Sequence, residues 1–460
     1  MFLTRKDTLP TKEALVTDSG ERVTYGDLFE DCALLDRELV KRCLLIVLTD
    51  HSSETLRFYY ASMSGKRVPL LLDGGLSIEF LDRYISLYRP RYVWASVRYE
   101  PALAAKGHVL YRSPEHILVD TAEAVYPMHE NLALLLTTSG STGNPKVVRL
   151  SYENLNENAC AIVEALGIDQ NARGVTIPPM HYTYGMALCH MHFYAGATLL
   201  VTNYRVIDKR FHSFIRKEGI TNIQGVPFIH EMLDRIGFYD DLPPQINLVT
   251  MGGGKAREDL QQKMNCIFEQ KGILFCALYG QTEGTTMLTR LPEGKKMNEP
   301  GCIGVACRGM RAEVSPETGE LIFYGSSVSL GYATCAEDLI RGDDNHGVLH
   351  TGDLAVMDEK GAIYLQGRIR RFIKMAGVRI NLDDIEQLVT GGFPQIACAC
   401  SGKDNDLHIF VTGKPDPTQI KRLVARKLNV SHILIQVIDC DQLPRKSNGK
   451  IDYQELEQRL

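Results

Sequence analysis

Short apolar runs alternate with amphipathic helical stretches through the first two-thirds of the chain. The predicted strands cover 44–48, 132–136, 198–201, 222–226 and 246–250, and two predicted helices cover 155–166 and 211–218. This alternation is typical of an α/β fold with largely parallel sheets. Because 460 residues exceed what one hydrophobic core usually holds, we expect two or more domains.

The pattern of the sequence changes near Gly361, where a glycine-closed strand over 361–367 runs into the basic segment 368–371. Beyond it we predict strands at 372–375, 408–412 and 434–438 and helices at 381–388 and 418–428, with Asn381 as the cap of the first helix. We therefore predict a large N-terminal domain of layered β-sheets and helices over 1–367. A small, mobile α+β domain over 368–460 follows a hinge at 367–371.

Composition excludes several classes of protein. The net charge of −5 gives no basic excess to attract nucleic acid or an anionic membrane. The twelve cysteines show no zinc-site spacing, and the N-terminus becomes charged too early for a secretory signal. The apolar run 44–48 is too short to span a bilayer. We expect a cytoplasmic protein with reduced thiols and no membrane span.

The segment 134–146 runs from an apolar strand into five hydroxyl residues, two glycines and a lysine. Glycines let backbone N–H groups turn inward, hydroxyls donate hydrogen bonds and the lysine adds a positive charge, so the segment is suited to polyphosphate. The alternative is a flexible surface loop, but apolar runs at 132–136 and 147–150 hold both ends. A P-loop NTPase is excluded because Gly140 and Gly143 are too close together and a strand-like run follows Lys146.

The loop 138–146 resembles the signature of the adenylate-forming superfamily, which includes acyl- and aryl-CoA synthetases, peptide-synthetase adenylation domains and beetle luciferase. Further motifs of that superfamily follow in order, from about Gly65 to Lys450, so the resemblance covers nearly the whole chain. The resemblance implies the following residues for nucleotide binding: Thr138, Ser139, Gly140, Ser141, Thr142, Gly143, Lys146, Gly253, Gly254, Tyr279, Gly280, Asp353 and Arg368.

Within Tyr279-Gly-Gln-Thr-Glu283, the resemblance implies Tyr279 against the adenine, Thr282 near the α-phosphate and Glu283 on Mg²⁺. A carboxylate that holds Mg²⁺ beside phosphates offsets their mutual repulsion. The turn Thr351-Gly-Asp353 and Arg368 match the superfamily's ribose-binding residues.

Lys450 matches the lysine of the superfamily's C-terminal motif, which bridges the carboxylate and the α-phosphate during adenylation. Attack of one anion on another is opposed by Coulomb repulsion, and a cation placed between the two offsets it. The resemblance thus implies catalytic roles for Lys450 and Thr282.

The implied reaction has two halves. A carboxylic acid and MgATP give acyl-AMP and pyrophosphate, and CoA then takes the acyl group and releases AMP. Rotation of the small domain would present the face 374–379, with Lys374 and Gly377 beside the pantetheine path. His181, in the segment 178–185, would gate the thiol tunnel near the acid or simply be a packed histidine.

The acid is expected not to be an α-amino acid, because no aspartate lies between Pro178 and His190 to bind an ammonium group. Three alternatives stay open at this stage. The acceptor could be the phosphopantetheine of a separate carrier protein, it could be an amine or oxygen nucleophile, or the chain could be a nucleotide-binding module without catalysis. The motif that contains Gly331 and Tyr332 receives only a structural role.

Overall fold

The computed structural model describes residues 8–137, 146–295, 299, 301–375, 378–428, 430–446 and 450–460. The chain divides into two compact units. The larger unit contains Met1–Lys255, Gln261–Ala312 and Phe323–Leu349, and the smaller contains Ala256–Leu260, Glu313–Ile322 and His350–Leu460. The predicted boundary between 367 and 368 stays a prediction.

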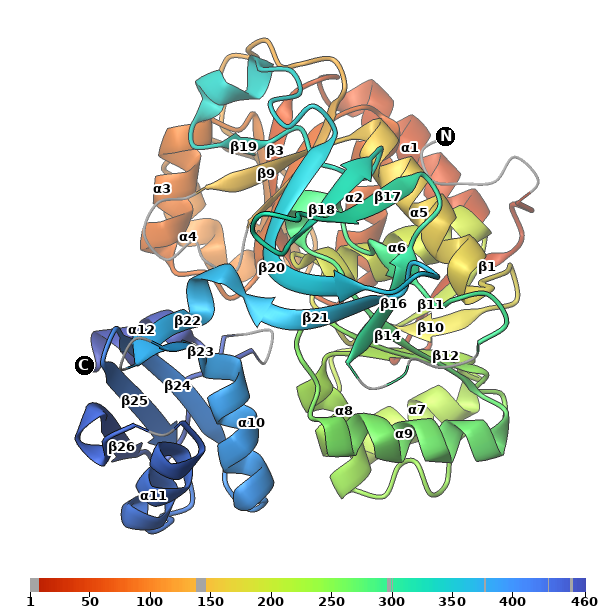
Figure 1. Ribbon diagram of the computed structural model, residues 1–460. Coiled ribbons are helices and arrows are strands. Elements are labelled where there is room, and N and C mark those ends of the chain that lie inside the picture. The colour runs from red at the N-terminus through yellow and green to blue at the C-terminus, as the bar shows by residue number, and fades with distance from the viewer. Residues whose placement is uncertain are drawn as a thin grey trace. The chain divides into compact units, whose positions relative to one another are not determined.

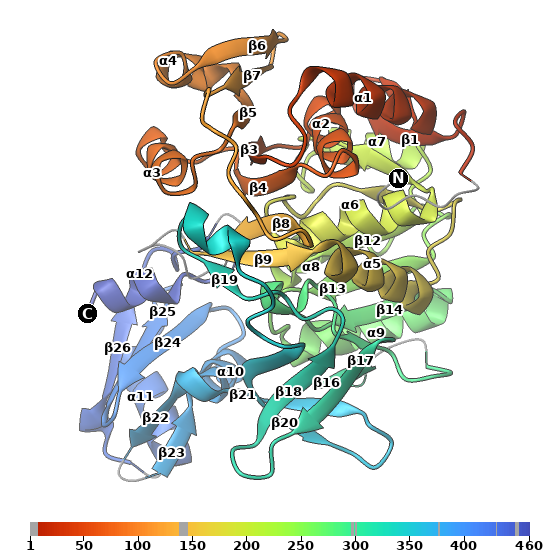
Figure 2. The ribbon, with the colours of Figure 1, turned by 90° about the horizontal axis from the view of Figure 1, so that it is seen from above.

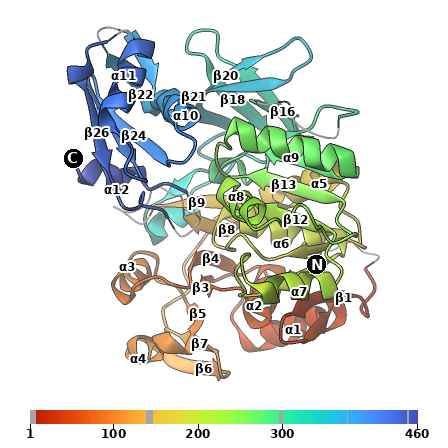
Figure 3. The same ribbon diagram turned by 90° about the horizontal axis from the view of Figure 1, so that it is seen from below.

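One sheet of the larger unit has the strand order β14-β13-β12-β10-β11-β1-β2, and every pair is parallel except β1 with β2. Helix α8 packs against β12 and β13 (Figure 3). The strands are β1 (Glu13–Thr17), β2 (Arg22–Thr24), β10 (Arg173–Val175), β11 (Thr198–Val201), β12 (Asn222–Gly225), β13 (Leu248–Gly252) and β14 (Leu274–Leu278). The helices between them in the chain are α6 (Thr183–Ala195), α7 (Lys209–Lys217), α8 (Pro227–Arg235) and α9 (Glu258–Lys271).

A second sheet of the larger unit has the order β19-β9-β8-β4-β3-β5-β7-β6. Helix α5 follows β9 directly and packs beside α6 (Figure 2). The strands are β3 (Leu44–Thr49), β4 (Val68–Asp73), β5 (Tyr92–Ser96), β6 (His108–Arg112), β7 (His116–Asp120), β8 (Leu132–Thr137), β9 (Val147–Ser151) and β19 (Tyr332–Ala333). The accompanying helices are α1 (Tyr25–Glu38), α2 (Ser53–Ser64), α3 (Ile78–Tyr88), α4 (Glu100–Leu103) and α5 (Tyr152–Leu166).

Strands β8 and β9 are antiparallel neighbours, with Thr137 opposite Val147. The segment that we predicted to bind phosphates therefore joins two paired strands, and a strand follows Lys146, as the sequence indicated. Other strands are β15 (Thr289–Arg290), β16 (Cys302–Ala306), β17 (Met310–Val314), β18 (Glu320–Gly325), β20 (Val348–Met357) and β21 (Ile363–Arg368).

The last ninety or so residues contain a β22–β23 hairpin and a three-stranded sheet, β24-β25-β26 (Figure 1). The pleat sends alternate side chains of β24 and β25 to opposite faces. Cys400 and Ile409 join the core beneath α10 and α11, whereas Ala399 and Phe410 pack with Leu456 of α12. The elements are β22 (Phe372–Met375), β23 (Val378–Asn381), α10 (Leu382–Gly392), β24 (Cys398–Lys403), β25 (Asp406–Val411), α11 (Pro417–Leu428), β26 (Ile435–Asp439) and α12 (Tyr453–Gln458).

The predicted helix cap is confirmed, because the Asn381 side chain accepts a hydrogen bond from the N–H of Asp383 at 2.9 Å. Among the described residues, no helix combines the length and the apolar character that a bilayer crossing requires.

Candidate active site

Two of the predicted nucleotide-binding segments leave the same edge of the parallel sheet. In the β13–β14 pair, Gly252 lies opposite Leu278, so Gly253 and Tyr279 begin their loops side by side. Ligands of open α/β sheets bind outside the carboxyl ends of the strands. The fold therefore brings together two of the segments that the resemblance assigned to nucleotide binding.

The loop after β14 is tightly folded. A Cβ atom on Gly280 would lie 1.4 Å from the carbonyl oxygen of Thr286, so only glycine fits there. The ring of Tyr279 stacks on Phe323, with 6.1 Å between the ring centroids. Thr183, at the start of α6, donates a hydrogen bond to the carbonyl oxygen of the neighbouring Thr285 and so ties this loop to α6. These contacts fix the backbone that carries Thr282 and Glu283.

Lys146 and Glu283 lie far apart in the sequence, yet both contact the side chain of Tyr332. The hydroxyl of Tyr332 donates a hydrogen bond to Glu283 Oε1 at 2.7 Å, and Lys146 Nζ lies 3.2 Å from the centre of the Tyr332 ring. A glutamate carboxylate beside a lysine suited to phosphates fits Mg²⁺, because that ion usually takes one or two protein carboxylates together with substrate phosphates. Thr138, Ser139, Gly140, Ser141, Thr142 and Gly143 lie outside the described residues.

A fully buried arginine, Arg149, holds the segment that carries Tyr332. Its guanidinium donates to the carbonyl oxygens of Tyr332 at 3.2 Å and Leu330 at 2.6 Å, and to Asp344 Oδ2 at 2.6 Å. The same group also donates to two further carbonyl oxygens, those of Arg341 and Gly342. Lys146 directly precedes β9, and Arg149 of β9 anchors the segment that carries Tyr332.

The hydrogen bonds around His181 fix which of its nitrogens carries the proton. The Thr49 hydroxyl donates to the carbonyl oxygen of Leu72 at 3.1 Å, so its 3.0 Å contact with His181 Nδ1 requires that Nδ1–H donates. Nε2 lies 3.8 Å from Asp73 Oδ2 and has no hydrogen-bond partner among the described residues. Burial lowers the pKa of His181 to about 4, with Asp73 opposing the shift and His51 reinforcing it. At neutral pH His181 is thus a neutral imidazole with its lone pair on Nε2.

We expect nitrogen-15 NMR of the protein at neutral pH to show His181 as the Nδ1–H tautomer. The resonances of this one ring are assigned by their loss in the His181→Gln variant. Thr49→Val removes the acceptor for Nδ1–H and shifts the ring towards a mixture of tautomers, whereas Thr49→Ser keeps the acceptor and the wild-type spectrum. An Nε2–H ring in the wild-type protein would contradict this assignment.

A small cavity, with room for about one water molecule, lies beside these segments. Leu166 of α5, Leu188 and Met191 of α6 and Leu278 of β14 supply apolar surface, and Tyr184, Gln224, Thr250 and Thr286 also line it. The hydroxyl group of Tyr184 is 2.7 Å from Thr250 Oγ1, which is two residues before the end of β13. None of the described lining residues is charged.

In the smaller unit, the two predicted ribose-binding residues lie opposite each other on the β20–β21 pair. Arg368 Nε donates to Asp353 Oδ1 at 3.0 Å, and Asp353 is buried. The hydroxyl of Thr351 donates to the carbonyl oxygen of Leu321 at 2.6 Å and accepts from the N–H of Asp353 at 3.1 Å. The expected turn is therefore wrong: Thr351, Gly352 and Asp353 lie within β20, and these hydrogen bonds hold the backbone that carries Asp353.

Lys450 lies just before α12. Arg445 and Ile451 form an antiparallel bridge, and the N–H of Lys446 donates to the carbonyl oxygen of Lys450 at 2.8 Å. Desolvation, with the charges of Arg368 and Lys446, lowers the pKa of Lys450 to about 8. In the β22–β23 hairpin Lys374 pairs with Arg379, and Gly377 lies outside the described residues.

The AMP-binding enzyme family matches residues 2–333, which is most of the chain. This chain belongs to the AMP-binding enzyme family. The predicted resemblance to adenylate-forming proteins is therefore confirmed, and the roles of the individual site residues stay predictions.

Curated relatives of this AMP-binding enzyme include two 2-succinylbenzoate–CoA ligases. The protein from Oceanobacillus iheyensis is 23% identical over 400 residues, which cover 84% of this chain and 82% of that protein. The protein from Bacillus cytotoxicus is 28% identical over 345 residues, which cover 71% of this chain and 70% of that protein.

Two solved structures show the same fold. ATP-bound MatB from Rhodopseudomonas palustris has a TM-score of 0.79 and 21% identity, covering 99% of this chain and 97% of that one. The o-succinylbenzoate CoA synthetase MenE from Bacillus subtilis, in complex with its acyl-adenylate intermediate, has a TM-score of 0.77 and 20% identity, covering 97% and 96%. The predicted α/β class is confirmed.

Sequence reasoning missed three contributors to the site of this AMP-binding enzyme. Thr49 ends an apolar strand and gave no signal. Arg149 is a charged residue inside the apolar run 147–150, which was a signal for a buried, fully bonded guanidinium. Tyr332 was noticed only as part of a structural motif.

Proposed function

We propose that this AMP-binding enzyme is an acid–thiol ligase. It joins a carboxylic acid to ATP, giving acyl-AMP and pyrophosphate, and then transfers the acyl group to the thiol of CoA with release of AMP. The observation that carries the proposal is the meeting of Lys146 and Glu283 at Tyr332, beside the loops that leave β13 and β14. The names of the curated relatives, which are CoA ligases, support CoA as the acceptor.

In the first half-reaction, a carboxylate oxygen of the acid attacks the α-phosphorus of ATP, and the bond from that phosphorus to the pyrophosphate oxygen breaks. Lys146 binds the phosphates, Asp353 and Arg368 bind the ribose, and Lys450 holds the two anions together. Thr282 binds the α-phosphate, and Mg²⁺, when bound at Glu283, would supply positive charge against the phosphates. Each of these residues acts on charge rather than by covalent chemistry.

In the second half-reaction, the thiol sulfur forms a bond to the acyl carbon, the bond from that carbon to the phosphate oxygen breaks, and the thiol proton is released. We propose that the segment after 367 rotates between the halves and presents Lys374 and Gly377 to the pantetheine arm. His181, buried and neutral, gates the thiol path. Its neutrality suits this role, because a cation there would compete with Lys450 for the carboxylate.

The absence of an aspartate between Pro178 and His190 favours an acid without an ammonium group. A buried ammonium group without a carboxylate partner would be costly. This enzyme is therefore expected to use a small carboxylic acid that is not an α-amino acid. The substrate named for its curated relatives, 2-succinylbenzoate, meets this condition.

ATP–pyrophosphate exchange tests the proposal. The panel contains butyrate, 3-hydroxybutyrate, benzoate, 2-succinylbenzoate and alanine, each with MgATP and labelled pyrophosphate. We expect exchange with at least one of the first four acids and none with alanine, because only alanine brings an ammonium group to the site. Loss of free CoA thiol in the presence of the active acid then separates CoA from a carrier-protein acceptor. Exchange with alanine alone would contradict the assignment of the acid.

A further inference from the structure

Tyr332 touches two oppositely charged residues that the proposed function assigns to the nucleotide. Its hydroxyl donates to Glu283 Oε1 at 2.7 Å, and Lys146 Nζ lies 3.2 Å from the centre of its ring. Among the described residues, no ion pair joins Lys146 directly to Glu283. One side chain therefore holds the proposed magnesium ligand and the proposed phosphate-binding lysine at once.

The two contacts leave Glu283 and Lys146 able to bind Mg²⁺ and phosphate. A hydroxyl that donates to a carboxylate fixes the orientation of that carboxylate without neutralising it. The face of an aromatic ring attracts an ammonium group and leaves its charge intact. A direct pair between Lys146 and Glu283 would have to break before either residue could bind phosphate or Mg²⁺. Tyr332 holds each residue while keeping both charges available.

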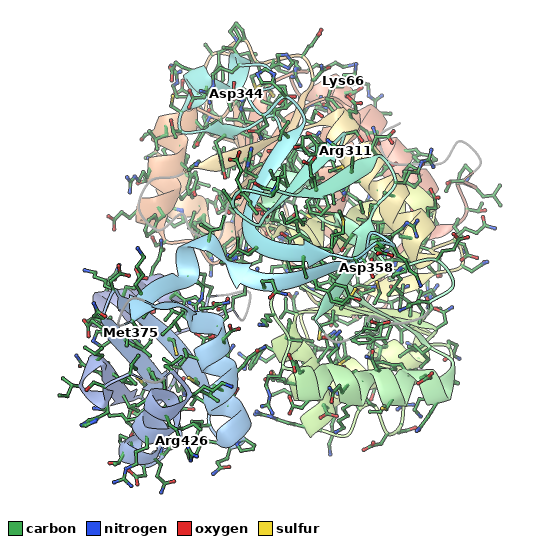
Figure 4. All side chains as sticks on the ribbon, in the orientation of Figure 1. Lys66, Arg311, Asp344, Asp358, Met375 and Arg426 are labelled. Atoms are coloured by element: carbon green, nitrogen blue, oxygen red, sulfur yellow. The ribbon has the colours of Figure 1, made fainter. Side chains whose placement is uncertain are left out.

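The position of Tyr332 is fixed by β9, the strand that begins directly after Lys146. In the β19–β9 pair Tyr332 lies opposite Val148, and Arg149 Nε donates to its carbonyl oxygen at 3.2 Å. Gly331 has a φ of +105°, and a Cβ atom there would lie 3.0 Å from Cβ of Asp344, whose side chain is labelled in Figure 4. The chain therefore needs glycine at this point to set Tyr332 between the two charged residues.

We infer that Tyr332 is a positioning residue for the nucleotide: its hydroxyl orients Glu283 for Mg²⁺, and its ring positions Lys146 for the phosphates. The inference rests on the proposed function, which supplies ATP and Mg²⁺ as the ligands. Because the two contacts come from different parts of one side chain, substitutions separate them.

The protein is titrated with ATP in a calorimeter, once in EDTA and once in excess MgCl₂. The titration in EDTA tests the contact with Lys146, and the difference between the two titrations tests the contact with Glu283. Neither titration requires the acid substrate to be known. Tyr332→Phe keeps the ring but loses the hydrogen bond to the charged Glu283. Mg²⁺ is therefore expected to raise the ATP affinity of this variant about tenfold less than it raises that of the wild-type protein. Its affinity for ATP in EDTA is expected to stay unchanged. Tyr332→Leu loses both contacts and is also expected to weaken binding in EDTA, by about threefold.

Tyr204→Leu is the matched control, because Arg210 lies over that ring at 4.5 Å, yet neither residue belongs to the site. It is expected to bind ATP like the wild-type protein. The inference is overturned if Tyr332→Phe keeps the wild-type response to Mg²⁺, or if it weakens both titrations by the same factor, as a purely structural role would. A wild-type protein that binds ATP under neither condition would instead overturn the proposed function.

Discussion

Lys450→Ala is expected to lower ATP–pyrophosphate exchange by about a thousandfold or more, because the only cation proposed to move between the two reacting anions is lost. The exchange assay uses whichever acid of the panel is active. Melting temperature and circular dichroism of the variant are measured alongside, so that the loss of exchange is assigned to the lysine in a folded protein.

The pH dependence gives a second measure of the same residue. Lys450 has a pKa lowered to about 8 and is charged below that value, so kcat/KM for exchange is expected to fall as pH rises through it. The decline is about tenfold per pH unit, as for loss of one essential proton. Lys450→Arg keeps its charge at high pH, so its residual exchange is expected to lack this decline.

Lys427→Ala, which removes an exposed lysine from α11 in the same unit, is the control and is expected to retain wild-type exchange. Exchange within about threefold of wild type in a folded Lys450→Ala variant would remove the catalytic assignment, because one missing cation is expected to cost far more.

The sequence predicted those parts of the fold that are encoded locally. The apolar runs at 44–48, 132–136 and 198–201 became β3, β8 and β11, because each is a short run that a buried strand requires. The strands on either side of the segment predicted to bind phosphates were predicted correctly, because each is a short apolar run, and they are β8 and β9. Asn381 was recognised as a cap from the acidic residues that follow it.

What the sequence could not predict depends on contacts between distant residues. Strand β24 was missed because it consists of small residues, cysteine, alanine, serine and glycine, which are not typical of a strand. The tautomer of His181 is set by Thr49, and the placement of Glu283 depends on Tyr332. The residues of each pair are far apart in the sequence, so no sequence periodicity predicts their contact. The pairing of separate strands and loops brings them together.

Arg149→Met is expected to lower the free energy of unfolding by about 4 kcal/mol, because several carbonyl oxygens lose their donor while methionine cannot replace it. The side chain of Arg149 is fully buried, and its hydrogen bonds hold the backbone from Leu330 to Asp344. The side chain of Asp344 is 43% exposed, so water hydrogen-bonds to its carboxylate once the guanidinium is removed. The main loss therefore comes from the carbonyl oxygens, and calorimetric melting measures it.

Arg308→Met is the matched control, because that guanidinium makes a single 3.0 Å ion pair with Glu164 and both side chains are about 60% exposed. Exposed ion pairs contribute about 0–1 kcal/mol, so its melting temperature is expected to stay close to wild type. Arg149→Met is also expected to weaken MgATP binding, because the same guanidinium fixes the backbone of Tyr332 between Lys146 and Glu283. If Arg149→Met melted like Arg308→Met, the segment 330–344 would be held by its strand pairing alone, and Arg149 would have no part in building the site.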